Sequence, residues 1–249
     1  MEQPVVLITG ASRGIGAATA QLAASQGYAV VVNYASNAQA ANEVVAAVQA
    51  QGAPAMAIAA DVSQEAQVNQ MFETIDAQWG RLDVLINNAG VLEQTMPLIE
   101  MQADRLQRVM AINVLGVLFC CQAATRRMAL SRGGRGGAIV NVSSMAARLG
   151  SPFEYIDYAA SKGAVDTITV GLAKELATEG VRVNGVRPGL IYTDIHASGG
   201  DANRVDRLLS TVPMKRGGEA IEVAKAIMWL ACADSSYTTG HLIDVSGGR

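Results

Sequence analysis

The sequence predicts an α/β fold in which a doubly wound parallel sheet lies between two layers of helices. Short apolar runs rich in valine and isoleucine alternate with segments of helical length along the whole chain. These runs are apolar throughout, which is typical of strands buried on both faces. Repeated strand–helix–strand units form right-handed crossovers in one sheet. We therefore expect three layers in a single domain, residues 1–249.

The expected strands are short runs dominated by aliphatic residues. They cover residues 5–9, 29–34, 55–61, 84–88, 138–143, 181–186 and 242–246. The segments between them are long enough for helices and cover residues 15–26, 39–51, 64–79, 103–129, 158–178 and 221–232. The glycine-rich stretch at 131–137 is expected to be a loop.

Residues 192–218 form a polar segment without a clear helical or strand period. An irregular insert beyond the carboxyl end of a strand is where doubly wound folds place a substrate lid. We therefore expect a lid around 192–218, and the alternative is a plain surface connection.

The composition limits the classes of function. Hydrophobic residues make up 50% of the chain, charged residues 16%, and the net charge is −3. Neither a nucleic acid partner nor a membrane is expected from so weak a charge and from the absence of a long uncharged apolar stretch. The beginning of the chain lacks a secretory signal pattern, and three cysteines show no metal spacing, so we expect a cytoplasmic protein without a metal site.

A glycine-rich loop follows the first expected strand and opens the first helix. It reads TGASRGIG over residues 9–16. Gly10 permits a tight turn, Gly14 lets the backbone approach a pyrophosphate, and Gly16 allows close packing of helix on strand. The free N–H groups of the helix N-terminus attract phosphates. The loop therefore predicts a dinucleotide site.

The end of the second strand favours NADP(H) over NAD(H). Sites for NAD place an acidic residue there to bind the ribose 2′-hydroxyl. This chain has Asn33 and Tyr34 instead, and Arg13 lies inside the glycine loop. A guanidinium without a nearby carboxylate suits a 2′-phosphate. The alternative is that Arg13 is a solvated loop charge and Asn33 a turn residue.

The stretch EYIDYAASKG contains two tyrosines and a lysine. Tyr158 and Lys162 are four residues apart, so they share one helix face, whereas Tyr155 lies about two turns from Lys162. A nearby cation lowers the pKa of tyrosine from its usual value of about 10. Tyr158 is therefore the candidate acid/base, with an ordinary amphipathic helix as the alternative.

Polar residues interrupt or end apolar segments at two further places, the end of one strand and the middle of one helix. The strand before Tyr158 ends in Ser143 and Ser144, and a serine at a carboxyl end points into the ligand crevice. Strand alternation places the two on opposite faces without choosing between them. Asn113 interrupts an apolar helix, either as a buried amide bonded to its neighbours or as a polar link from Lys162 through water to solvent.

These motifs together resemble the short-chain dehydrogenase/reductase family, which has a Rossmann-type fold. The resemblance covers nearly the whole chain through the glycine loop, NNAG at 87–90, RPGLIYTD at 187–194 and YTTGHLIDVSGG at 237–248. It implies a catalytic tetrad of Asn113, Ser144, Tyr158 and Lys162. In that tetrad, Tyr158 is the acid/base and Lys162 lowers its pKa and holds the nicotinamide ribose. Ser144 polarises the substrate oxygen, and Asn113 positions a water.

The resemblance and the glycine loop together give the expected cofactor contacts. Asp61 and Val62 would meet adenine, with a polar strand end as the alternative for Asp61, and Ile191 and Thr193 would hold the carboxamide. The full set is Gly10, Ser12, Arg13, Gly14, Ile15, Gly16, Asn33, Asp61, Val62, Asn88, Ala89, Gly90, Tyr158, Lys162, Pro188, Gly189, Ile191 and Thr193.

The expected function is NADP(H)-dependent interconversion of a small-molecule carbonyl and an alcohol. A 3-oxoacyl-carrier-protein-type reductase, a sugar dehydrogenase and a non-enzymatic NADP(H)-binding sensor are the alternatives. Arg126, Arg127, Arg132 and Arg135 would meet an acidic carrier or else form a solvated face. The connection from Ser144 to Tyr158 is one residue longer than in fatty-acid-type reductases.

Position along the chain also suggests pocket residues and an assembly. The expected pocket residues are Met145, Leu149, Phe153, Tyr155 and His196. The resemblance further implies a homotetramer formed through the two long helices, 103–129 and 158–178, and the C-terminal segment.

Overall fold

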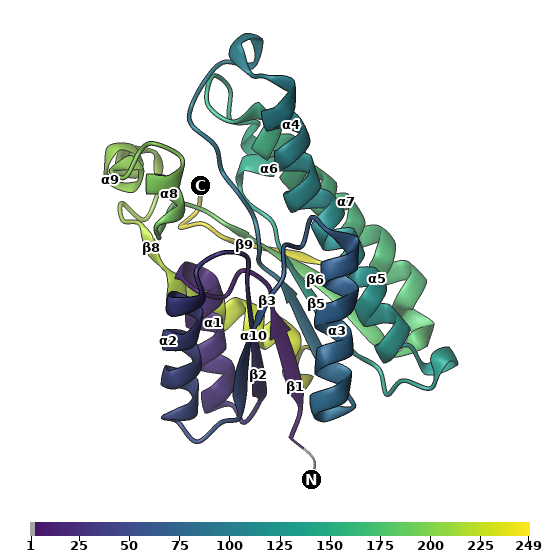
Figure 1. Ribbon diagram of the computed structural model, residues 1–249. Helices are drawn as coiled ribbons and strands as arrows, with labels where there is room; N and C mark the ends of the chain where they lie inside the picture. The colour runs from purple at the N-terminus through teal and green to yellow at the C-terminus, as the bar shows by residue number, and fades with distance from the viewer. Residues whose placement is uncertain (1–2) are drawn as a thin grey trace.

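A parallel sheet forms the centre of the α/β fold, as the sequence predicts. A computed structural model describes residues 3–249, so the first two residues of the expected domain lie outside the described part. The sheet has seven strands in the order β3-β2-β1-β4-β5-β6-β9 (Figure 1). From β1 the chain moves outward to β2 and β3 and then returns to β4 on the other side of β1. This reversal opens a crevice at the carboxyl ends of β1 and β4.

Each expected strand is present, with bounds within two residues of the prediction. Side chains along β1 alternate between two cores: Val5 and Leu7 pack on one face, and Val6 and Ile8 on the other. Burial on both faces explains why the strands read as unbroken apolar runs. The strands are β1 Val5–Ile8, β2 Ala29–Tyr34, β3 Ala55–Ala59, β4 Val84–Asn87, β5 Gly137–Val142, β6 Val181–Pro188 and β9 Leu242–Val245.

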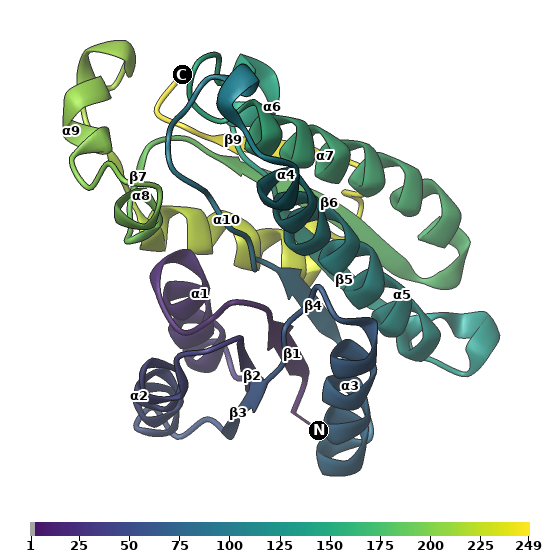
Figure 2. The same ribbon diagram turned by 45° about the horizontal axis from the view of Figure 1, so that its top comes forward.

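The main helices form two layers, one on each face of the sheet (Figure 2). One layer contains α1 Gly14–Ser25, α2 Ala38–Gln49 and α10 Ala220–Ala231. The opposite layer contains α3 Glu65–Trp79, α5 Gly116–Met128 and α7 Ile156–Leu176. These two layers with the sheet between them are the three layers that the sequence predicts.

The long helix expected at 103–129 is interrupted by one wide turn. α4 covers Ala103–Met110, a π-helical turn (η2) covers Ala111–Leu115, and α5 follows directly. Asn113 lies in that turn, and turns of this kind often mark functional sites. By length and composition alone, the span Ala103–Met128 could cross a membrane, but 50% of its apolar window is buried inside the domain. The core helix of a domain can be equally long and apolar and is also largely buried.

The connections contain short elements that the sequence did not predict. Outside the lid these are η1 Leu98–Glu100, η3 Leu130–Arg132, α6 Ala146–Leu149, η4 Ala177–Glu179 and η6 Ala233–Ser235. The lid segment, residues 192–218, folds into short pieces rather than an open loop: β7 Ile191–Tyr192, α8 Ile195–Ser198, α9 Arg204–Leu208, η5 Leu209–Thr211 and β8 Gly218–Glu219. The pairing of β7 with β8 closes the segment, and Leu190, Val205 and Val212 form a small core beneath it. That the segment acts as a lid remains a prediction.

A buried chain of polar side chains joins α7 to the central strands. Asn87 Nδ2 donates to Asn141 Oδ1 at 2.9 Å, and Asn141 Nδ2 donates to Thr169 Oγ1 at 2.9 Å. All three side chains are buried, so each partner that is lost leaves a polar group without compensation. The chain therefore fixes α7 relative to β4 and β5, whose carboxyl ends border the crevice.

Replacing members of this chain is expected to destabilise the fold. Asn141→Leu removes a buried hydrogen bond from each of Asn87 and Thr169 and should lower the free energy of unfolding by about 1–3 kcal/mol. Thr169→Val should cost about 1 kcal/mol, while Thr167→Val on the exposed side of α7 should cost less than that. Urea denaturation measures all three. Equal stability of the Thr169 and Thr167 variants would show that the buried hydrogen bond contributes nothing.

Candidate active site

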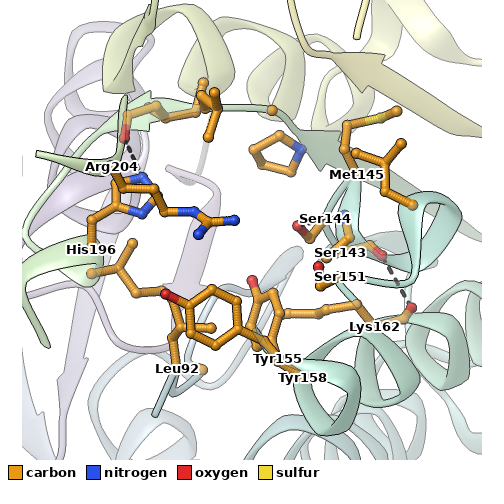
Figure 3. Close-up of a pocket in the computed structure, with 18 of the residues that line it drawn as sticks. Leu92, Ser143, Ser144, Met145, Ser151, Tyr155, Tyr158, Lys162, His196 and Arg204 are labelled. Atoms are coloured by element: carbon orange, nitrogen blue, oxygen red, sulfur yellow. Dashed lines mark hydrogen bonds between the residues drawn. The ribbon is translucent and has the colours of Figure 1, made fainter. Parts of the chain in front are cut away.

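A cavity of about 430 Å³ opens at the carboxyl ends of the central strands. Three of the predicted catalytic residues line it: Ser144 after β5, and Tyr158 and Lys162 on α7. Segments far apart in sequence supply the remaining walls, including β6 and the lid segment (Figure 3). The structure thus brings together groups that the sequence places separately.

Ser144 and Tyr158 form the polar pair at the centre of the cavity. Both side chains line the cavity, and the Ser144 hydroxyl accepts from Ala146 N at 3.1 Å. α7 begins at Ile156, so Tyr158 lies in its first turn, next to the end of β5. A reacting oxygen held between the two hydroxyls would receive hydrogen bonds from both.

The structure distinguishes the two serines that strand alternation left open. Ser143 is buried, and its hydroxyl donates to the carbonyl of Lys162 at 3.1 Å (Figure 3). That hydrogen bond holds β5 against α7 and occupies the Ser143 hydroxyl. Ser144 is the serine that acts on the pKa of Tyr158, and its place in the tetrad that the resemblance implies stays a prediction.

Lys162 is a buried lysine fixed beneath Tyr158. Its Nζ donates to Val142 O at 2.8 Å and lies 5.6 Å from the centroid of the Tyr158 ring. Burial lowers the pKa of Lys162 to about 8, although Asp166 opposes the shift. The ammonium is therefore held by a backbone carbonyl at the end of β5 and by the face of an aromatic ring.

That Lys162 lowers the pKa of Tyr158 stays a prediction, because other groups determine the direction of the shift in the protein alone. Burial raises the pKa of Tyr158 above its ordinary value, while the hydrogen bond from Ser144 and the charge of Arg204 oppose the rise. The physical reason is that desolvation of a phenolate outweighs the two favourable contacts. From the protein's own groups, Tyr158 is thus a protonated phenol at neutral pH.

Asn113 lies behind the cavity and is fully buried. Its Oδ1 accepts from Val91 N at 2.8 Å, and its Nδ2 donates to Val91 O at 3.1 Å and to Ser161 Oγ at 3.1 Å. A Cβ on Gly90 would lie 3.4 Å from both Asn113 Oδ1 and Lys162 Nζ, so both groups approach this glycine closely. The side chain is bonded to its neighbours, and its role in holding a water remains a prediction.

The glycine loop has the shape that a pyrophosphate site requires. Gly10 and Gly14 have φ values of +60° and +56°, which favour glycine. A Cβ on Gly16 would lie 2.6 Å from Asn88 Nδ2. The N-cap position of α1, Arg13, makes no side-chain capping bond, so the N-terminal N–H groups of α1 are left for a ligand. These features fit the phosphates of a dinucleotide.

The predicted cofactor contacts, those of the glycine loop included, divide into two groups. Those that line the cavity are Ile15, Asn88, Gly90, Tyr158, Lys162, Pro188, Gly189, Ile191 and Thr193. The others lie outside it, at the ends of the first strands and along the adjoining loops: Gly10, Ser12, Arg13, Gly14, Gly16, Asn33, Asp61, Val62 and Ala89. This division suits an extended ligand with one end in the cavity.

Two residues of the second group, Asn33 and Asp61, form hydrogen bonds within the protein. Asn33 is buried; its Oδ1 accepts from Gly10 N at 3.2 Å, and its Nδ2 donates to Ala60 O at 3.0 Å. Asp61 Oδ1 accepts from both the N–H and the hydroxyl of Ser63. Asn33 therefore ties the glycine loop to β2 and β3, and its contact with a cofactor stays a prediction.

The expected pocket residues are confirmed except for one. Met145, Leu149, Tyr155 and His196 line the cavity. Phe153 does not: its side chain is 80% exposed, and its φ of +63° turns it outward in a tight loop. The physical reason is the left-handed turn around Ser151 and Phe153, which no periodicity reveals.

Two charged cavity residues, Glu154 and Arg204, were not predicted from the sequence. Arg204 Nη2 donates to Glu154 Oε2 at 2.6 Å, which joins the lid segment to the loop before α7. No sequence signal marked the pair, because its members are 50 residues apart in segments without periodicity. Within residues 3–249, no cluster of metal-ligating side chains occurs.

The chain belongs to the short-chain dehydrogenase/reductase family. A family model described as Enoyl-(Acyl carrier protein) reductase matches residues 10–249. The crystal structure of a short-chain type dehydrogenase/reductase from Mycobacterium marinum superposes with a TM-score of 0.92 at 34% identity, covering 98% of this chain and 94% of that one.

Two curated relatives are similar over nearly their full lengths. An uncharacterized oxidoreductase of Escherichia coli K12, YgfF, is 54% identical over 98% of this chain and 99% of its own. A 3-oxoacyl-[acyl-carrier-protein] reductase of Synechocystis is 40% identical over 98% of this chain and 96% of its own. The protein is thus an oxidoreductase of this family.

The close packing at Gly16 yields a testable prediction for the cofactor site. Gly16→Ala places a methyl group against Asn88 and the Gly10 carbonyl, which should weaken binding of a nicotinamide dinucleotide by about tenfold or more. Gly171→Ala on α7 is the matched control, because a methyl group there would meet nothing within 4 Å beyond its own helix. Fluorescence titration with NADPH measures both. Unchanged affinity in Gly16→Ala would contradict a phosphate site at this loop.

Proposed function

We propose that the protein is an NADP(H)-dependent oxidoreductase that interconverts a carbonyl and an alcohol, with Tyr158 as the acid/base. The observation that carries this proposal is that Ser144 and Tyr158 line one cavity, with the Nζ of the buried Lys162 5.6 Å from the centroid of the Tyr158 ring. A protonated phenol next to a second hydroxyl is suited to donating a proton to a carbonyl oxygen.

The residues present fit a nicotinamide dinucleotide. The glycine loop and the N-terminus of α1 would hold its phosphates, and Gly90, Ile191 and Thr193 would border the nicotinamide end. When bound, the reduced cofactor supplies a hydride to the carbonyl carbon. Tyr158 gives its phenolic proton to the carbonyl oxygen, Ser144 orients that oxygen, and Lys162 is placed to bind the ribose.

The choice of NADP(H) rests on charge. β2 ends in Asn33 and Tyr34, so this strand end offers no carboxylate for a ribose 2′-hydroxyl. Arg13 is exposed at the start of α1, where its guanidinium donates to Ser198 Oγ of the lid segment at 3.2 Å. A guanidinium at this position would attract a 2′-phosphate.

A 3-oxoacyl-carrier-protein-type reductase is the second candidate, supported by the Synechocystis relative. The arginine cluster at 126–135 gives this candidate little support. Arg132 precedes β5, and Ser144 follows that strand, so the two lie about 20 Å apart along it. Arg127 is already paired with Asp76 at 2.6 Å. An acidic carrier docked there would therefore lie at the amino-terminal ends of the strands, whereas the cavity lies at their carboxyl-terminal ends.

The remaining parts of the proposal concern the alternative functions, the assembly and the location of the protein. A sugar dehydrogenase shares the same catalytic set, whereas a non-enzymatic sensor would have no use for Ser144, Tyr158 and Lys162 together. We also propose a cytoplasmic homotetramer that contacts no nucleic acid and no membrane. Light scattering measures the assembly.

Removal of the Tyr158 hydroxyl tests the mechanism. Tyr158→Phe should bind NADPH normally and lose about 10²–10⁴ in kcat, because no group replaces the proton donor. The matched control is Tyr237→Phe, since Tyr237 is fully exposed. NADPH consumption with a panel of ketones, 3-oxoacyl thioesters and sugars supplies the assay. Near-wild-type kcat in Tyr158→Phe would refute the role of Tyr158.

Cofactor preference is a separate prediction. The absence of a carboxylate at the end of β2 should give a kcat/KM at least about tenfold higher with NADPH than with NADH. Steady-state kinetics with both cofactors and one substrate measure this ratio. A preference for NADH would overturn the assignment of Arg13 and of the strand end.

A further inference from the structure

The wall of the cavity that faces Ser144 carries polar atoms that the proposed hydride transfer does not use. Within the described residues, Arg204 Nη1, Tyr155 Oη and His196 Nδ1 are buried and have no hydrogen-bond partner. All three side chains line the cavity that contains Tyr158. Buried polar atoms without partners are costly, so three in one place indicate a ligand that satisfies them.

The guanidinium of Arg204 is held by two contacts, and its buried Nη1 atom has no hydrogen-bond partner. The residue is only 7% exposed, its Nη2 donates to Glu154 at 2.6 Å, and its guanidinium carbon lies 4.9 Å from the centroid of the Tyr155 ring. Figure 3 shows the guanidinium reaching into the cavity from the side of His196, across from Ser144. Two fixed contacts therefore aim Nη1 at the space where a substrate lies.

The charges around Arg204 favour an anion. Glu154 is shared, because Arg207 also approaches it at 3.7 Å while pairing with Asp201. Arg249 adds a further positive charge to the cavity lining. A guanidinium whose carboxylate partner is shared retains attraction for a second carboxylate, and hydrogen bonds between charged groups are the stronger kind.

The two neighbours of Arg204 supply neutral groups of opposite kinds. Tyr155 is 2% exposed, and its hydroxyl can donate beside Arg204 Nη1. His196 Nε2 lies 3.0 Å from Ile191 O, so Nε2 carries the hydrogen and Nδ1 can only accept. Burial lowers the pKa of His196 below its ordinary value, so the ring is neutral at pH 7. A carboxylate would therefore bind Arg204 and Tyr155, and His196 would suit a substrate hydroxyl.

We propose that Arg204 and Tyr155 form a subsite for a carboxylate of the substrate, so that the natural substrates are small oxo acids and the matching hydroxy acids. The proposal rests on the proposed function for the reaction itself. The loop before Tyr158 carries both Glu154, which pairs with Arg204, and Tyr155.

The kinetic test uses a series of short oxo acids and their methyl esters, which share the carbonyl and differ in charge. The wild type should prefer each acid over its ester by about 10- to 100-fold in kcat/KM, mainly through KM. Arg204→Gln should remove that preference by slowing only the acids, and Tyr155→Phe should reduce it in part. Equal use of acids and esters by the wild type, or an equal loss for both in Arg204→Gln, would overturn the proposal.

The matched control is Arg216→Gln. Arg216 is exposed, belongs to the same lid segment and pairs with Glu222, but it does not line the cavity. This variant should keep the preference for acids. If Arg216→Gln loses the preference as fully as Arg204→Gln does, the effect belongs to the general charge of the lid segment, and the proposed subsite is wrong.

A binding experiment separates this proposal from the proposed function. Calorimetry with a short saturated carboxylic acid and its primary amide requires no turnover. The wild type should bind the acid about tenfold more tightly than the amide, and Arg204→Gln should bind both alike. If this holds while no carbonyl compound oxidises NADPH, the proposed function fails and the subsite stands. If ketones are reduced but the wild type binds acid and amide alike, the subsite fails and the function stands.

Discussion

The contact between Lys162 Nζ and Val142 O is the interaction on which the site depends. It is a buried hydrogen bond of 2.8 Å that joins α7 to the end of β5. Together with the bond from Ser143 to the Lys162 carbonyl, it fixes the first turns of α7 against the strand that ends in Ser144. Tyr158 lies near Ser144 because α7 is joined to the end of β5 at Lys162, one helical turn after Tyr158.

The same burial that fixes the site also determines its protonation. Desolvation lowers the pKa of Lys162 and raises that of Tyr158, since in both cases the charged form is disfavoured. The protein's own groups consequently hold Tyr158 as a neutral phenol that is ready to donate a proton. Ser144 and Arg204 act in the opposite direction, so the pKa of Tyr158 depends on which substrate-facing groups surround the hydroxyl.

The sequence predicted the fold well because local patterns carry it, and the same patterns placed Tyr158 and Lys162 side by side. Unbroken apolar runs identified each strand, and the four-residue spacing of Tyr158 and Lys162 placed them on one face of α7. What it could not predict depends on contacts between distant segments or on single backbone angles. Arg204 reaches the cavity through a lid segment without periodicity, and Phe153 turns outward at a positive φ. The direction of the Tyr158 shift required knowledge of burial.

The ionisation of Tyr158 decides whether the site holds a neutral phenol beside Ser144. The difference in phenolate absorbance between the wild type and Tyr158→Phe, followed against pH, isolates this one side chain. We expect Tyr158 to be less than half ionised at pH 10, its ordinary midpoint, and Ser144→Ala to raise the midpoint further. A midpoint below 10, or one that Ser144→Ala leaves unchanged, would contradict a buried, protonated phenol paired with Ser144.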